Sequence, residues 1–409
     1  MYVTVVRCLI ALLAIGGMTA CQSSDDEQCE EMVSATASGA VRGNFTPSNA
    51  STRTLIAVTD SNSYQPAEFA QAIIDWPMIS YAGETMMKLM DKTVKLAVNS
   101  RVPLMDKMFD QRYGTAADGA RQWKVQRYVF TYKSVSGISG NDTTLVGSVV
   151  FPTNTNGRPH EIDMLTLYHH QAYFLDSWLP SNSLTMMAIH ALHNSAVIEP
   201  DAQGAEGNMV KLIASNLEGD VTCLQMVDCV LAALEVMRDH GVTPAPGYYS
   251  NSWGTSLGTV ATAGFAQYME NDAPEDLQQL INLRATYMGE GPTELSHVRG
   301  FENAVANPRV QKYNNGWHPR LPFYISTCPN DELVNYGAMK EYYNKLRTMP
   351  DGTTLPNVHW LDLNVPHTDV EKMFDEYTGN HLLSAVIQLV YISMVEDPAD
   401  MEGVMMPSN

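Results

Sequence analysis

The chain has 409 residues, 45% of them hydrophobic, so it is long and apolar enough to bury a substantial core. Only 17% of the residues are charged, and the formal net charge is −20. Because such an acidic surface repels phosphate backbones, the composition excludes nucleic acid as an expected partner. The six cysteines show no Cys-x-x-Cys or Cys/His ligand spacing, so we expect no structural zinc or other metal.

The first residues have the pattern of an export signal. Arg7 precedes an apolar run at 8–18, which is too short for a comfortable membrane span. Thr19-Ala20-Cys21 follows and resembles the lipobox of bacterial lipoproteins, in which the signal is cut before a cysteine that then carries lipid. We therefore expect a signal peptide at 1–21 and an exported outer-membrane lipoprotein anchored through Cys21, periplasmic or at the cell surface. An ordinary cleaved signal is the alternative.

Two segments separate this signal from the main domain. Residues 22–55 are rich in Ser, Thr, Asp and Glu, a composition typical of a flexible linker. Residues 56–126 are Met-rich with spacings near a helical period, which predicts a helical N-terminal extension. Residues 127–400 then form the predicted main domain.

Strand and helix patterns alternate through the main domain. Apolar and β-branched runs predict eight strands, at 127–134, 144–151, 164–168, 194–198, 248–253, 283–288, 322–327 and 358–363. Helical patterns occur at 184–192, 221–238, 257–270, 336–346 and 382–394. A hairpin followed by such alternation predicts an α/β fold with a mostly parallel eight-stranded sheet flanked by helices. In such sheets, reactive groups lie in loops at the carboxyl ends of the strands.

The sequence Gly254-Thr255-Ser256-Leu257-Gly258 follows a predicted strand and precedes a predicted helix. In a Gly-x-Ser-x-Gly turn the serine projects clear of the sheet, and the glycines avoid clashes on either side of it. The helix behind the turn offers free amides, of which that of Leu257 would face a developing oxyanion. The motif predicts Ser256 as a nucleophile.

A second serine could occupy the turn instead. Ser252 lies in Ser250-Asn251-Ser252-Trp253-Gly254, four residues upstream. We favour Ser256, because bulky Trp253 and Thr255 would crowd Ser252 and the preceding strand would become very short.

The partners of the serine are expected to follow it in the order acid, then histidine. Asp331 comes just after the strand at 322–327, where its carboxylate can orient an imidazole; Glu332 is a weaker candidate. Capping of the next helix is the structural alternative for Asp331. Two histidines follow the last strand. We favour His367, after a short loop, over His381, which directly precedes the closing helix.

The second half of an oxyanion hole is expected in the loop after the strand at 164–168. There, the backbone amide of Gln171 or Ala172 would donate to the oxyanion, and His170 would act as a structural brace. This chemistry requires no metal and no organic cofactor.

Several motifs together resemble one known family. They are the run from Tyr168 to Ser181, the run from Asn194 to Gly204, the helix at 228–233, the serine turn and the segment Asp331 to Val334. On these, residues 128–395 resemble the secretory-lipase-like branch of the α/β-hydrolase superfamily. The resemblance implies the α/β-hydrolase fold and ester hydrolysis.

The chain departs from the family pattern at two places. Gln171 stands where the family has glycine, so we expect an oxyanion loop that is tighter or differently aimed. The cap near 290–320 is short, which favours small or soluble acyl substrates over interfacial triglyceride.

We therefore expect a serine hydrolase that cleaves carboxylic esters of small molecules through an acyl-enzyme. A serine peptidase or amidase of the same fold is one alternative, and a non-catalytic surface-binding lipoprotein is the other. The sequence leaves the oligomeric state open, and it predicts membrane contact through the N-terminal lipid only.

Overall fold

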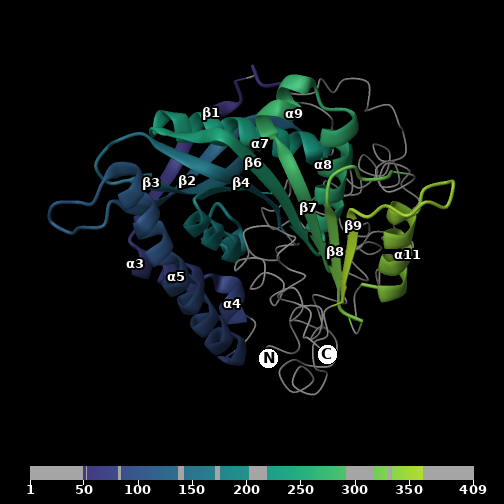
Figure 1. Cartoon of the computed structure of the whole chain (residues 1–409), viewed down its shortest axis with the longest axis horizontal. Helices are drawn as coiled ribbons and strands as arrows, with labels where there is room; N and C mark the ends of the chain where they lie inside the picture. Colours follow the sequence, from purple (N-terminus) through teal and green to yellow (C-terminus); the bar gives the residue numbers. More distant parts are fainter. Residues whose placement is uncertain are drawn as a thin grey trace, which may run out of the picture.

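The computed structural model describes residues 49–51, 53–81, 84–136, 142–170, 176–201, 219–291, 317–329, 331 and 334–362. These residues form one large sheet with helices on both faces (Figure 1). The predicted signal and Cys21, the linker up to residue 48, the cap residues 292–316 and the closing helix at 382–394 lie outside the described residues.

The sheet has nine strands in the order β1-β2-β3-β5-β4-β6-β7-β8-β9. Their bounds are β1 Leu55–Tyr64, β2 Trp123–Val135, β3 Asp142–Asn154, β4 His160–His169, β5 Ser195–Pro200, β6 Val242–Thr255, β7 Leu283–Gly289, β8 Phe323–Thr327 and β9 Val358–Asp362. Strands β1, β2, β3 and β5 pair antiparallel in succession. The other five pairs, from β5–β4 to β8–β9, are parallel.

The prediction of eight strands is wrong by one. The eight predicted strands correspond to β2 through β9, and β1 is an additional antiparallel strand at the edge, paired from Leu55 opposite Tyr132 to Tyr64 opposite Val125. The sequence places this segment at the linker and the start of a helical extension. Residues 56–61 are exposed on both faces of the strand, so they lack the apolar–polar alternation that identifies a half-buried strand.

Helices cover the two faces of the sheet. One face carries α3 (Pro66–Ile74), α4 (Pro77–Tyr81), α5 (Glu84–Tyr113) and the 3₁₀ helices η3 (Asp176–Trp178) and η4 (Met186–His193). The opposite face carries α7 (Gly219–Asp239), α8 (Gly258–Asn271), α9 (Glu275–Ile281) and α11 (Tyr336–Arg347) (Figure 1). Each face has its own apolar core, because side chains of a buried strand alternate between the two layers.

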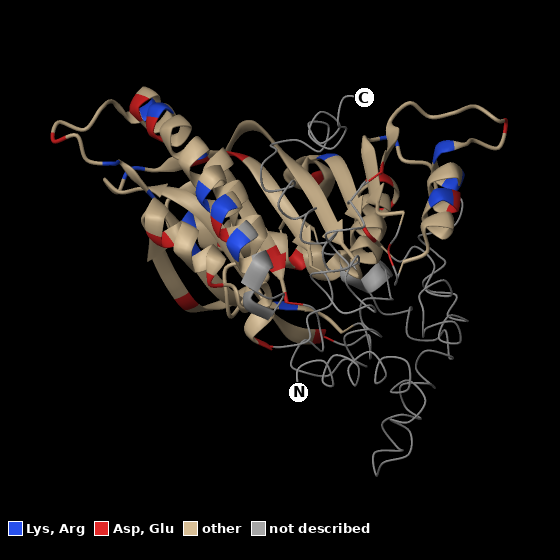
Figure 2. Cartoon of the chain, turned by 90° about the horizontal axis from the view of Figure 1, so that it is seen from below, with Lys and Arg blue, Asp and Glu red and all other residues tan. Residues whose placement is uncertain are grey.

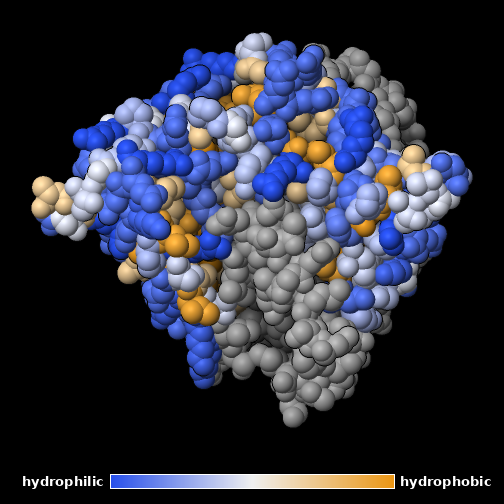
Figure 3. All heavy atoms as spheres, viewed as in Figure 1, coloured by the Kyte–Doolittle hydropathy of each residue, from blue (hydrophilic) through white to orange (hydrophobic). Residues whose placement is uncertain are grey.

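The outer surface of these helices is mostly polar, and α5 also exposes Met87, Leu96 and Leu104. Figure 2 shows basic and acidic residues interspersed along α5, where Lys95 pairs with Asp91 one turn earlier. On the face of Figure 3, the described residues are mostly hydrophilic, with small and separate apolar areas. Within the described residues, no helix is both long and apolar enough to cross a membrane.

Candidate active site

Four parallel strands end at one edge of the sheet. Residues 253–255 of β6 lie beside 287–289 of β7, and Gly289 in turn lies beside Ser326 of β8. On the other side of β6, Gly254 lies beside His169, the last residue of β4. Side chains that follow these strand ends therefore gather at this edge, as expected for a parallel sheet.

Ser256 occupies the turn between β6 and α8. Its φ is 51°, in the left-handed region that non-glycine residues rarely adopt. Hydrogen bonds hold its backbone on both sides: its amide donates to the carbonyl of Gly289 at 2.8 Å, and its carbonyl accepts from the hydroxyl of Thr259 at 2.7 Å. The side chain is partly exposed, whereas the neighbouring strand and helix residues are buried. The strained turn therefore leaves Ser256 accessible at the edge of the sheet.

The two glycines of the motif stand where backbones pass closely. A Cβ at Gly258 would overlap the backbone carbonyl of His169 and lie 2.6 Å from the oxygen of His170. A Cβ at Gly254 would lie 2.6 Å from the carbonyl oxygen of Gly258 and 2.8 Å from Thr262. Real Cβ atoms do not approach so closely, so both glycines are required for α8 to pack against the ends of β4 and β6.

Ser252 does not occupy a turn. It lies within β6, is fully buried, and its hydroxyl is 2.6 Å from that of Thr262 on α8. Its hydroxyl is thus enclosed between sheet and helix, which leaves Ser256 as the serine at the strand end.

Leu257 is the N-cap of α8, with helical φ and ψ of −56° and −31°. Within the described part of the chain, its amide donates to no acceptor, as expected for the first amides of a helix. The positive end of the helix dipole lies at the same place. An anion beside Ser256 would find a donor and a favourable field there.

The loop after β4 passes directly behind this turn. His169 and His170 are both buried, and their carbonyls contact the position of Gly258. Burial lowers the pKa of His169 to about 3, with a smaller contribution from the charge of His170, so the ring of His169 is neutral at pH 7. That ring packs against Phe265 of α8, with 5.5 Å between ring centroids. The predicted oxyanion donors Gln171 and Ala172 lie outside the described residues.

Asp331 follows β8 by four residues and is half-buried. Its carboxylate accepts a hydrogen bond from the amide of Val334 at 2.8 Å, and its own amide donates to the carbonyl of Cys328 at 3.2 Å. The N-cap of α11 is Asn335, whose side chain accepts from the amide of Ala338. Helix capping is therefore performed by another residue, and Asp331 belongs to the strand-end turn.

Ser256 and Asp331 follow strands that are two positions apart in the sheet, with β7 between them. At about 4.8 Å per strand, the two strand ends lie roughly 10 Å apart. An imidazole with a hydrogen bond at each end spans roughly 8 Å, a length comparable with this separation of the strand ends. The predicted bases His367 and His381, and the alternative acid Glu332, lie outside the described residues.

Sequence reasoning missed one residue at this edge, Glu290. It directly follows β7, is fully buried and has a φ of 49°. The only sequence signal was its setting, Gly289-Glu290-Gly291, where a charged residue stands between two glycines after a buried strand. No described cluster of three or more His, Cys, Asp or Glu residues is arranged to hold a metal ion.

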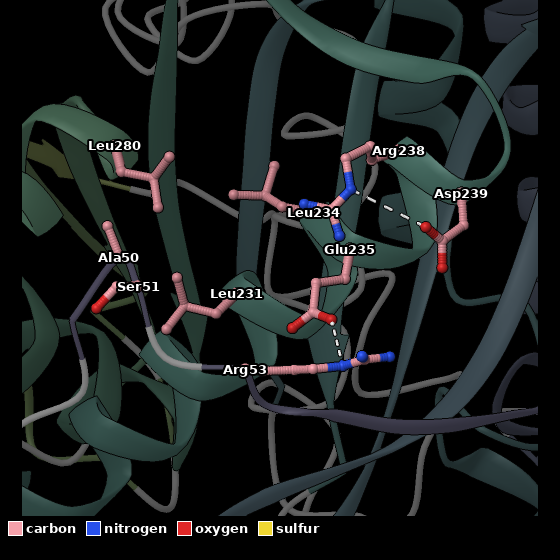
Figure 4. A pocket seen from close by; sticks show the side chains of 9 residues that line it. All are labelled: Ala50, Ser51, Arg53, Leu231, Leu234, Glu235, Arg238, Asp239 and Leu280. Atoms are coloured by element: carbon pink, nitrogen blue, oxygen red, sulfur yellow. Dashed lines mark ion pairs between the residues drawn. The ribbon is translucent and has the colours of Figure 1, made fainter.

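A surface groove of about 410 Å³ lies elsewhere, between α7, α9 and the segment at 50–53 (Figure 4). Leu231, Leu234 and Leu280 form its apolar part, and Arg53 pairs with Glu235 across it at 3.3 Å. Helix α7 ends just before β6 begins, so the groove is near the amino ends of the parallel strands. Ligands of such sheets bind at the carboxyl ends, and we assign no role to this groove.

Comparisons with known proteins support the fold. No protein-family model and no curated protein matches this sequence. Among solved structures, the rice cell wall degrading esterase LipA from Xanthomonas oryzae is 14% identical, with a TM-score of 0.52 over 74% of this chain and 96% of that one. A protein of Legionella pneumophila provisionally assigned as a hydrolase is 12% identical, with a TM-score of 0.50 over 84% of this chain and 100% of that one. The chain thus shares its fold with these two proteins.

Proposed function

We propose that the protein is a serine hydrolase that cleaves carboxylic esters of small molecules through an acyl-enzyme. The observation that carries this proposal is the conformation of Ser256, a left-handed serine between a buried strand and a buried helix. A strained backbone of this kind persists only where surrounding packing enforces it, and it is common at functional sites.

The first step is attack of the Ser256 hydroxyl on the ester carbonyl. A histidine after β9, His367 in preference to His381, takes the hydroxyl proton and passes it to the departing alcohol. Asp331 holds this imidazole in the required tautomer and stabilises its positive charge. Water activated by the same histidine then attacks the acyl-enzyme and releases the carboxylic acid.

The negative charge of the tetrahedral intermediate requires donors that are in place beforehand. The amide of Leu257 at the start of α8 is one, and an amide of Gln171 or Ala172 is the second. His170 is buried where its carbonyl contacts Gly258, a position from which it braces this loop. Removal of one such donor costs about 10²–10³ in kcat in a serine hydrolase.

The structural likeness supports an ester as the substrate. LipA is an esterase that degrades rice cell wall, and it shares the fold over most of its length. The segment of about thirty residues between β7 and β8 is short for a lid, which favours small or soluble esters over lipid interfaces.

Labelling with a fluorophosphonate tests the nucleophile directly. The wild-type chain and Ser252→Ala should be labelled, whereas Ser256→Ala should be neither labelled nor active on p-nitrophenyl acetate. Ser252→Ala is the matched control, because it removes a hydroxyl four residues earlier, within the strand that leads into the turn. Labelling of Ser256→Ala equal to that of the wild type would reject the nucleophile. An unlabelled wild type would favour the non-catalytic alternative, and faster turnover of aminoacyl-anilides than of esters would favour the peptidase.

A paired substitution tests the base. His367→Gln should lower kcat by several orders of magnitude, whereas His381→Gln should leave it near the wild-type value. The reverse pattern would assign His381, and wild-type activity in both variants would remove both histidines from the mechanism.

A further inference from the structure

Glu290 is a fully buried carboxyl group at the edge of the sheet where Ser256 and Asp331 lie. Its amide donates to the carbonyl of Ser326 at 3.0 Å, and the hydroxyl of Thr327 is 3.5 Å from its Oε2 atom. It therefore connects the end of β7 to the end of β8. Burial of a carboxyl group is costly, so its presence here requires compensation by the groups around it.

The backbone around Glu290 also belongs to the serine turn. Gly289, the residue before it, accepts the hydrogen bond from the amide of Ser256. Gly291, the residue after it, lies so close to Thr259 of α8 that a Cβ would overlap that side chain. The left-handed φ of 49° at Glu290 is thus enforced from both sides. A glycine would adopt this conformation without strain, so the glutamate side chain is retained at a cost.

The order of the strands places Glu290 between the two other candidate groups. Ser256 follows β6 and Asp331 follows β8, and β7 is the strand between β6 and β8. An imidazole that contacts both Ser256 and Asp331 must lie over the end of β7, which is where Glu290 stands. A carboxylate at this position lies between the strand ends that carry the two groups such a ring would join.

We propose that Glu290 is a second carboxylate of the active site, a positioning residue that acts through the general-base histidine. It raises the basicity of the imidazole and stabilises the imidazolium that forms as Ser256 loses its proton, in addition to Asp331. This role rests on the proposed function, because it presupposes a histidine that takes a proton from Ser256.

Other titratable groups surround this position and have to be distinguished from it. Tyr287 lies on β7 itself; burial raises its pKa, and the charge of Glu290 raises it further. Asp331 and Cys328 follow β8, and His169 ends β4 with His170 directly after it, behind the serine turn. Of these, His169 stays neutral at pH 7, since burial lowers its pKa to about 3.

The test is the pH dependence of kcat/KM for p-nitrophenyl acetate, whose acidic limb reports the pKa of the free base. Glu290→Gln should lower kcat at least about tenfold and move this limb down by about one pH unit, because a nearby negative charge is lost. Glu290→Asp should keep the limb near its wild-type position. Should the glutamine variant fail to fold, Glu290→Asn against Glu290→Asp gives the same comparison, since both residues tolerate a left-handed φ.

The matched control is Glu199→Gln, which replaces another fully buried carboxyl group near a strand end, that of β5. It should leave the limb unmoved. If fluorophosphonate labels the wild type but the acidic limb of Glu290→Gln stays at its wild-type position, the role of Glu290 is overturned and the proposed function stands. Equal shifts in Glu290→Gln and Glu199→Gln would overturn it as well. An unlabelled wild type would overturn the proposed function and this role together.

Discussion

Substitution of Gly258 by alanine tests the contact on which the proposed site depends. The added Cβ would overlap the carbonyl of His169 and lie 2.6 Å from the oxygen of His170. Both obstacles are backbone atoms, so no side-chain rotation relieves the contact. The start of α8 and the end of β4 must instead separate by at least about 1 Å to reach an ordinary contact distance.

The expected losses of activity and stability follow from the groups that lie on each side of the contact between α8 and β4. One side carries the amide of Leu257 and the turn at Ser256, and the other carries the loop with the second proposed oxyanion donor. A displacement of about 1 Å at a reacting geometry costs about 10²-fold in rate, and overpacking of a core costs about 1–3 kcal/mol of stability. Gly258→Ala should therefore lower kcat about a hundredfold and the free energy of unfolding by about 1–3 kcal/mol.

The assay combines initial rates on p-nitrophenyl acetate with urea unfolding of the same preparations. Gly337→Ala is the matched control: it is also a glycine in the first turn of a helix, but its Cβ would approach only the side chain of Asn335, at 3.1 Å. This variant should retain wild-type kcat. If Gly258→Ala also kept wild-type kcat and stability, the close approach of α8 to β4 and the oxyanion geometry built on it would both be refuted.

Two further predictions concern stability. Ser256→Gly should be more stable than Ser256→Ala in urea unfolding, by roughly 0.5–1 kcal/mol of unfolding free energy. Glycine relieves the strain of the left-handed φ, and this gain outweighs the larger conformational entropy that glycine loses on folding. Equal unfolding midpoints for the two variants would show that the turn is unstrained. Burial raises the pKa of Glu199 from 4.5 to about 7, so the folded chain holds a proton that the unfolded chain releases, and stability falls as pH rises from 4.5 to 7. Glu199→Gln should remove this decline, and parallel curves of unfolding free energy against pH for the variant and the wild type would contradict the burial of that carboxyl.

The sequence alone determined the alternation of strands and helices from β2 to β9. These strands are buried between two layers, so their apolar runs and the turn residues between them are visible without knowledge of the fold. The position of Ser256 was equally readable, because the two glycines required by the close packing of α8 are adjacent to it in the chain. Local signals of this kind need no tertiary information.

Only the tertiary structure decided the remaining features. Strand β1 is stabilised by pairing with β2 and is exposed on both faces, so it has no pattern of its own. The enclosure of Ser252 depends on Thr262, which comes from a different element. The place of Glu290 follows from the order of β6, β7 and β8 in the sheet. Contacts between residues distant in the chain determine these features, and a pattern read along the chain does not contain them.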